Sequence, residues 1–473
     1  MVFSSLLFVF VFLVLNLVIY FLVDKKYKNQ VLLIFSLIFY AWGGPRFLIL
    51  LVGETFISWF CGVRIQEGGN QRIRKMYMIL ECVLLLGLLG IFKYTVFLLG
   101  NLQALTGFPE SIPNIVLPIG ISFYTFQLLS YVIDVYRGEV HAQPKFWKLL
   151  LYSSLFHQCI EGPIVRYATV AEEIDVRKVS GTDVYVGVRR FCVGLAKKAI
   201  LANSCASAAD TLLQPGVEAL SAQSALGLWL GMLFYMLQIY LDFSAYSDMA
   251  IGMGRMVGFH YLENFNYPYM AGSVQDFWRR WHISLSTFFR DYVYIPLGGS
   301  RCDKWKIVRN MSVVWFLTGM WHGASWNYIF WGIYYLIFLL LERFVIQNRI
   351  PKGWNHVYTL LAVFFGWVIF RFEDLGELGT VLLGLFGIGT SGFAGLEVST
   401  VFMGNLFFLI FAVISVTSLG KNVRRFLFET GKTNEAVFMI FNVLELLTPP
   451  LLLILSVLSL IGASYNPFLY FQF

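Results

Sequence analysis

The stretch from Asn310 to Leu341 contains no Asp, Glu, Lys or Arg, and it constrains the fold of this chain more than any other feature. As one straight helix it would be about 48 Å long at 1.5 Å per residue. That length exceeds one upright crossing of a hydrocarbon core roughly 30 Å thick. Two glycines interrupt the run, in Gly319-Met-Trp-His322-Gly323. The sequence therefore predicts two helices that meet near His322, inside a membrane.

The composition also indicates a membrane protein. The chain has 473 residues, of which 58% are hydrophobic and 13% charged, whereas soluble proteins carry roughly 25% charged residues. Several apolar runs reach the length of about 20 residues that a spanning helix needs. We expect an all-α polytopic integral membrane protein. It would be a single membrane-embedded domain, residues 1–473, with about 10 to 12 transmembrane helices and further re-entrant and surface helices.

The net charge of +7 does not require a nucleic-acid partner. Lys and Arg gather in short loops between apolar runs, as is typical of cytoplasmic loops that face anionic lipid. The six cysteines form no CxxC pair, so no metal site is expected. The lipid bilayer is the predicted environment, and nucleic acid is not a predicted partner.

The N-terminal run from Met1 to Val23 is uncharged and is followed by Lys25, Lys26 and Lys28. A signal peptide has its basic residues before the apolar run and a small-residue cleavage site after it. The order here is the reverse. We therefore expect a retained first span with its N-terminus outside and the lysines in the cytoplasm, as in a multi-pass protein of a bacterial plasma membrane.

Two apolar stretches are predicted not to form upright spans. The stretch from Ser111 to Ile133 contains Pro113, Pro118 and Gly120, which break a straight helix. The run from Leu149 to Ile160 is too short to cross a bilayer upright. We expect a broken helix in the first case and a re-entrant or interfacial piece in the second, which membranes tolerate where protein or a cavity satisfies the freed backbone groups.

The segment Asp276–Tyr294 combines helical periodicity with charge, and we expect one partly amphipathic helix there. A basic, Trp-rich helix of this kind is often a membrane-surface element. The alternative is the wall of a tunnel for an anionic donor, with Arg279 and Arg290 near phosphate groups and His282 facing inward. The residues alone leave both interpretations open.

The histidine within the uncharged run is the strongest candidate for chemistry. Burying an ionisable group in a membrane is costly, so it indicates a functional site. A neutral imidazole can accept the proton of a hydroxyl group that attacks a thioester, and burial favours the neutral form. His322 therefore suits a general base, and His282 could orient or polarise a substrate. The same pair also fits a proton-coupled transporter.

Four segments together resemble a known family: Leu117–Gly138, Leu241–Gly252, Asp276–Ser300 and Thr318–Gly332. They read LPIGISFYTFQLLSYVIDVYRG, LDFSAYSDMAIG, DFWRRWHISLSTFFRDYVYIPLGGS and TGMWHGASWNYIFWG. In this order they are similar to the membrane-bound O-acyltransferase (MBOAT) family. The resemblance is strongest to its bacterial branch, the membrane subunit of alginate O-acetylation, to which the membrane subunit of lipoteichoic-acid D-alanylation is related. The core motifs fall within residues 117–341.

The resemblance implies a ring of tilted helices around a central tunnel. His322 would be the essential histidine of the family and His282 its second active-site histidine. Residues of the donor-binding tunnel would be Trp278, Arg279, Arg290, Asn310 and Trp321. An acyl donor such as acetyl-CoA would arrive from the cytoplasm. The acyl group would leave outside, where an exported SGNH-hydrolase-like acyltransferase would pass it to a polysaccharide.

The chain ends in FLYFQF, residues 468–473. This ending resembles the FxYxxF motif of a small companion protein of the D-alanylation system, which implies that Tyr470 would carry the acyl group as a phenolic ester. An aromatic anchor at the membrane interface is the alternative. Taken together, the sequence predicts O-acetylation of an extracellular or cell-wall polysaccharide. D-alanyl transfer to teichoic acid, or a proton-coupled transporter or flippase, stays open.

Overall fold

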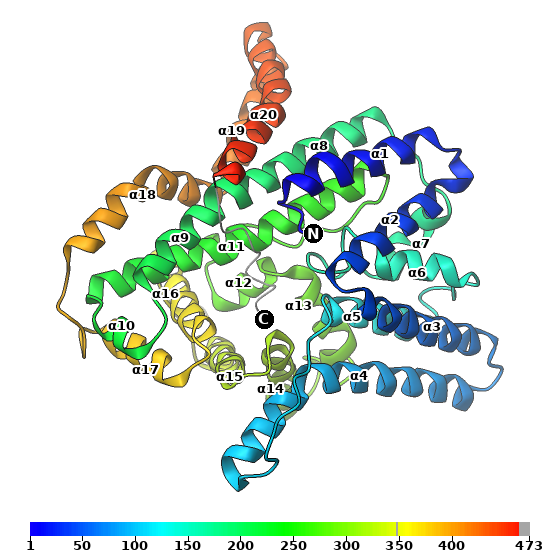
Figure 1. Ribbon diagram of the computed structural model, residues 1–473, viewed down its shortest axis with the longest axis horizontal. Helices are drawn as coiled ribbons and strands as arrows, with labels where there is room; N and C mark the ends of the chain where they lie inside the picture. The colour runs from blue at the N-terminus through cyan, green and yellow to red at the C-terminus, as the bar shows by residue number, and fades with distance from the viewer. Residues whose placement is uncertain (347–348, 463–473) are drawn as a thin grey trace. The chain divides into compact units, whose positions relative to one another are not determined.

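The computed structural model describes residues 1–346 and 349–462, and every regular element in these residues is helical (Figure 1). The chain divides into two compact units. One comprises Met1–Phe191 with Met249–Glu263, and the other comprises Cys192–Asp248 with Asn264–Phe473. The all-α fold is confirmed, and the organisation as one membrane-embedded domain stays a prediction. The C-terminal motif with Tyr470 lies outside the described residues.

The first unit begins with a π-helical turn, Phe8–Phe12, that continues into α1. Its helices are α1 (Leu13–Leu22), α2 (Lys28–Gly43), α3 (Pro45–Glu67), α4 (Gln71–Thr106), α5 (Ile121–Arg137), α6 (Phe146–Ser154), α7 (Tyr167–Asp175) and most of α8 (Gly181–Ala196).

The second unit holds all the predicted site residues that the structure describes. Its helices are α9 (Asn203–Leu212), α10 (Val217–Ser221), most of α11 (Ala225–Met256), α12 (Val274–Arg280), α13 (Ile283–Phe289), α14 (Lys304–His322), α15 (Trp326–Leu341), α16 (Lys352–Arg371), α17 (Leu375–Gly384), α18 (Leu396–Ser415), α19 (Leu419–Gly431) and α20 (Glu435–Ile461).

Seven helices in the described residues are long and apolar enough to cross a membrane, fewer than the number expected from the sequence. These spans are α3, α4, α11, α15 with its π-helical extension to Ile346, α16, α18 and α20. Two further apolar helices, Phe8–Leu22 and Leu375–Gly384, are shorter. The chain is a multi-pass membrane protein.

The broken helix predicted for Ser111–Ile133 is confirmed. Residues 111–118 form no helix, and α5 begins only at Ile121, directly after Gly120. Gly120 has φ 76°, and a Cβ there would lie 2.3 Å from the carbonyl oxygen of Cys159. Only glycine fits both the left-handed conformation and this close approach. The short run after Leu149 likewise forms only α6, nine residues long and too short to span.

Helices α14 and α15 lie side by side with their backbones in close contact (Figure 1). A Cβ on Gly319 would lie 2.4 Å from the carbonyl oxygen of Tyr328, and a Cβ on Gly332 would lie 2.5 Å from that of Trp315. Small residues permit such an approach of helices in membranes. This packing holds the C-terminal end of α14, and with it His322, against α15.

A buried ion pair joins the π-helical turn Lys197–Ala202 to α11 in the second unit. The Lys198 Nζ lies 2.6 Å from the Asp242 Oδ1, and both side chains are 3% exposed. The neighbouring Lys197 ammonium pairs with Asp248 in a less buried position. Burial of opposite charges together avoids the large cost of burying either charge alone, so these contacts tie the segment after α8 to α11.

Candidate active site

His322 is the last residue of α14, where the uncharged run is interrupted as predicted. The backbone is extended at Gly323, and a Cβ on this glycine would lie 2.2 Å from the ring of Tyr328. Helix α15 then starts at Trp326. The predicted helix junction at His322 is therefore confirmed, and its cause is the close approach that the glycine permits.

The imidazole of His322 lies in an aromatic wall and is 5% exposed. Its ring centroid is 4.8 Å from that of Trp331, 5.1 Å from that of Trp321 and 5.2 Å from that of Phe370. All three contacts are edge-on. The imidazole therefore packs among three aromatic rings and is largely shielded from solvent.

The single helix expected over Asp276–Tyr294 is wrong. The segment forms α12 and α13, each seven residues long, followed by a π-helical turn. The two helices are separated at His282, which has φ 42° and ψ 57°. Residues other than glycine adopt this left-handed conformation in only a few per cent of cases, and such backbone strain is often found at functional sites. The break turns the imidazole of His282 into the core, where it is 1% exposed.

Asn264 is the centre of the hydrogen bonds around His282. Its side-chain Oδ1 lies 3.1 Å from the His282 Nδ1 and accepts the hydroxyl hydrogen of Ser284 at 2.9 Å. Its Nδ2 donates to the Ser247 Oγ at 3.0 Å. The backbone oxygen of Asn264 accepts from the N–H of Ile283 at 2.9 Å, directly after the strained residue. Asn264 is fully buried and thus supports the turn through both its backbone and its side chain.

One indole contacts both histidines. The ring of Trp321 lies 5.7 Å from that of His282 and 5.1 Å from that of His322, measured between centroids. Phe243 of α11 packs against the other side of His282 at 4.7 Å. The structure therefore brings the two predicted histidines into one buried cluster with the predicted residue Trp321.

The other predicted tunnel residues occupy different surroundings. Trp278 is buried and packs edge-on against Trp315, Trp331 and Tyr335. It therefore reaches the cluster through Trp331, which also contacts His322. A role of Trp278 in binding a donor stays a prediction.

Asn310 is buried at the first half of α14 and holds a loop in place. Its Nδ2 donates to the carbonyl oxygen of Gly299 at 3.2 Å, and its Oδ1 accepts from Arg309. Arg279 and Arg290 are exposed, and Arg290 is paired with Asp291. The roles of both arginines in donor binding stay predictions.

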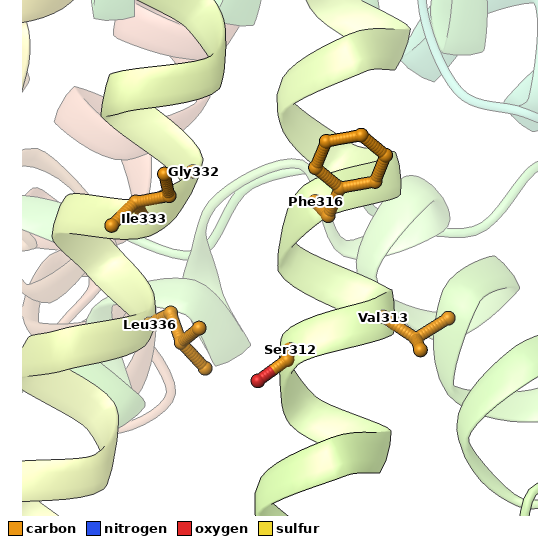
Figure 2. A pocket seen from close by; sticks show the side chains of 6 residues that line it. All are labelled: Ser312, Val313, Phe316, Gly332, Ile333 and Leu336. Atoms are coloured by element: carbon orange, nitrogen blue, oxygen red, sulfur yellow. The ribbon is translucent and has the colours of Figure 1, made fainter.

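Two of the cavities among the described residues of the second unit are lined by residues other than His282 and His322. Figure 2 shows the first, an apolar groove of about 370 Å³ between α14 and α15, with Ser312, Val313 and Phe316 on one helix and Gly332, Ile333 and Leu336 on the other. The second, of about 180 Å³, is lined by residues that include Gln275, Glu342 and Tyr358. The central tunnel stays a prediction.

Sequence reasoning missed Asn264, which contacts His282 from a turn 18 residues earlier. No spacing rule relates these two positions, because the contact depends on how α11 and α12 pack. The only available signal was the polar pair in Asn264-Phe-Asn266, a short interruption between two apolar segments. Sequence reasoning also missed Lys198, whose neighbour Asp242 stands in a motif that it did single out.

Two buried imidazoles in one aromatic cluster, in a multi-pass helical protein, define a candidate site for acid–base chemistry. The family model for MBOAT, the membrane-bound O-acyltransferase family, matches residues 139–375. The chain belongs to this family, and it is an O-acyltransferase. The resemblance and the fold class predicted from the sequence are both confirmed.

Named relatives agree with this assignment. The chain is 40% identical over 429 residues to the "Probable alginate O-acetylase AlgI" of Pseudomonas aeruginosa, covering 87% of this chain and 82% of that protein. It is 32% identical to the "Peptidoglycan O-acetyltransferase" of Helicobacter pylori, covering 82% and 80%. It is 28% identical to the "Teichoic acid D-alanyltransferase" of Bacillus subtilis, covering 53% and 66%.

Proposed function

We propose that this enzyme takes an acetyl group from acetyl-CoA at the cytoplasmic face and passes it across the membrane for O-acetylation of an extracellular polysaccharide. The observation that carries the proposal is the buried imidazole of His322 at the junction of α14 and α15. The acetyl group is supported by the names of the Pseudomonas aeruginosa and Helicobacter pylori relatives, an alginate O-acetylase and a peptidoglycan O-acetyltransferase, whose matches cover 87% and 82% of this chain.

In the proposed reaction, His322 is the general base. A hydroxyl oxygen forms a bond to the acetyl carbonyl carbon while its proton passes to the imidazole. The C–S bond of the thioester then breaks, and the departing thiolate takes the proton from the imidazolium, which restores the neutral ring. The burial of the ring at 5% exposure supports this role, because a base shielded from bulk water exchanges its proton with the reacting groups.

The same proposal includes a passage for the acyl donor and an exported partner protein that receives the acetyl group. Trp278, Arg279, Arg290, Asn310 and Trp321 would line the passage for the donor, with the arginines near its phosphates. The N-terminus would face the outside of a bacterial plasma membrane. An exported SGNH-hydrolase-like acyltransferase would receive the acetyl group and complete the transfer to alginate or a similar polymer.

D-alanyl transfer to teichoic acid is the second candidate. The Bacillus subtilis relative supports it, but the match covers only 53% of this chain, against 87% for the alginate relative. A proton-coupled transporter or flippase would use the same histidines without forming an ester, and it is the third candidate.

The donor distinguishes the first two candidates. We expect purified enzyme in liposomes to consume acetyl-CoA and to form a hydroxylamine-sensitive acetyl ester on a polysaccharide acceptor when the exported partner is added. A D-alanyl carrier protein should not replace acetyl-CoA. Ester formation from the D-alanyl carrier, with none from acetyl-CoA, would contradict the acetyl proposal and favour the second candidate.

Tyr470 can be tested as an acyl relay. Its phenol, with an ordinary pKa near 10, needs a base in order to attack an acyl donor. If it carries the acyl group, radiolabelled acetyl-CoA will label the C-terminal peptide, and Tyr470→Phe will lose both this label and polysaccharide acetylation. Tyr465→Phe is the matched control. Undiminished acetylation by Tyr470→Phe would remove the tyrosine from the mechanism and favour an interfacial anchor.

A further inference from the structure

The hydrogen bonds of Asn264 determine the orientation of its own amide group. The backbone N–H of Ser284 points at the Oδ1 position with an N···O distance of 3.3 Å. A backbone N–H can only donate, so the atom opposite it must be the amide oxygen. At the other end of the Asn264 amide, Nδ2 donates to the Ser247 Oγ, and a hydroxyl oxygen can accept this hydrogen bond, so this contact is compatible with the same orientation. Amide orientation is normally a matter of assignment, but here the chemistry of its neighbours leaves one solution.

The amide oxygen in turn determines the protonation of His282. The His282 Nδ1 lies 3.1 Å from this oxygen. Two acceptors facing each other at that distance repel, so Nδ1 carries a hydrogen. The Ser284 Oγ also lies 3.3 Å from Nδ1, but its hydroxyl hydrogen is donated to the same amide oxygen at the shorter distance of 2.9 Å. Burial lowers the pKa of His282 to about 3, and a neutral imidazole has a single N–H. Its Nε2 is therefore the nitrogen without a hydrogen.

We propose that Asn264 is a positioning residue that holds His282 as the Nδ1–H tautomer, so that the Nε2 of His282 accepts a hydrogen bond from the hydroxyl group that receives the acyl group. This inference rests on the proposed function and chooses between the two roles that the sequence left open for His282, orienting or polarising a substrate. A neutral ring without hydrogen on Nε2 cannot donate from that nitrogen to the thioester carbonyl. His282 therefore orients the attacking hydroxyl rather than polarising the donor.

The backbone around Asn264 makes the tautomer testable by substitution. The backbone oxygen of Asn264 accepts from Ile283, and the N–H of Asn266 donates to the carbonyl oxygen of Arg280. These two hydrogen bonds hold the backbone on both sides of His282, at Arg280 and at Ile283, and they involve no side chain of residues 264–266. They support the left-handed conformation at φ 42°, so replacing the Asn264 side chain leaves them in place.

The first test observes the ring directly. Isotope-labelled histidine in the full-length enzyme, in lipid bilayers, is measured by solid-state NMR, with His282→Gln used to assign the signals of residue 282. We expect a protonated Nδ1 and an unprotonated Nε2 in the wild type, and a mixture of tautomers in Asn264→Leu. A proton on Nε2 in the wild type would overturn the proposal. This readout does not depend on activity, so it stands whether or not the proposed function does.

The second test uses the pH profile of acyl transfer. Asn264→Asp keeps an acceptor opposite Nδ1–H but adds a negative charge, which favours the imidazolium. The pKa of His282 then rises in this variant. Because the protonated ring cannot accept a hydrogen bond on Nε2, acyl transfer is lost at low pH and regained as the pH increases. The acid limb of kcat should move to higher pH. Asn264→Leu should lower kcat at least about 10-fold with little change in KM.

Ser247→Ala is the matched control, since it removes the bond at the far end of the same amide and leaves the contact with His282. We expect its acid limb to coincide with that of the wild type. Wild-type kcat in Asn264→Leu, together with an unshifted acid limb in Asn264→Asp, would overturn the positioning role. Wild-type transfer in His282→Ala would instead contradict the proposed part of His282 in catalysis, without bearing on the tautomer.

Discussion

His322→Ala is expected to lower the rate of acyl transfer by about 10²- to 10⁴-fold, the usual contribution of a positioned general base. The ring of His322 lies at the end of α14 within contact distance of three aromatic rings, so the substitution removes the base without breaking a helix. The rate is measured as acetyl ester formed per enzyme molecule in liposomes, together with the melting temperature of the purified variant.

Two further variants separate chemistry from folding. His322→Gln keeps much of the side-chain volume but not the basic nitrogen, and it should lose as much activity as the alanine variant. His141→Ala replaces an exposed histidine of the first unit and should act like the wild type. A correctly folded His322→Ala with wild-type transfer would rule out the role of His322 as the base.

Lys198→Met is expected to destabilise the folded protein by about 3 to 5 kcal/mol, the usual cost of breaking a buried ion pair. Lys198 and Asp242 are each 3% exposed, with 2.6 Å between Nζ and Oδ1. Removing the ammonium leaves the carboxylate in the interior without its cation. The free energy of unfolding in detergent, measured against denaturant, gives the size of the effect.

The first control is an ion pair of the same type whose side chains are exposed to solvent. Lys432 and Glu429 also lie 2.6 Å apart, but they are 55% and 57% exposed. Lys432→Met should therefore cost less than about 1 kcal/mol. Adding Asp242→Leu to Lys198→Met should recover much of the lost stability, because both charges are then absent. Equal losses for the buried and the exposed pair would contradict the importance assigned to burial.

The parts of the fold that the sequence predicted correctly are those that local chemistry determines. Gly323, directly after His322, and the proline-rich stretch before Gly120 stand where helices end or have not yet begun, and glycine and proline disfavour a helix through the backbone itself. The apolar runs predicted a multi-pass helical protein for a similar reason. Seven of the described helices are long and apolar enough to cross a membrane, and the larger number of spans expected from the sequence stays a prediction.

The break at His282 could not be predicted, because the segment from Asp276 to Tyr294 has no glycine or proline near that position and its pattern favours one helix. The backbone and side chain of Asn264, on a different part of the chain, stabilise the turn instead. Tertiary contacts override local preference here, as they often do at functional sites. The pairing of Lys198 with Asp242 is a tertiary contact of the same kind.

The most direct test of the central claim, that a buried imidazole at residue 322 drives acyl transfer from a thioester, is a stoichiometric one. Enzyme in liposomes receives acetyl-CoA, the exported partner and a polysaccharide, and the free CoA thiol and the acetyl ester are measured in the same sample. Wild-type enzyme should release one thiol for each ester formed, and His322→Ala should form neither above background. Proton-coupled movement of a solute by the wild type, with no thiol released and no ester formed, would contradict the claim.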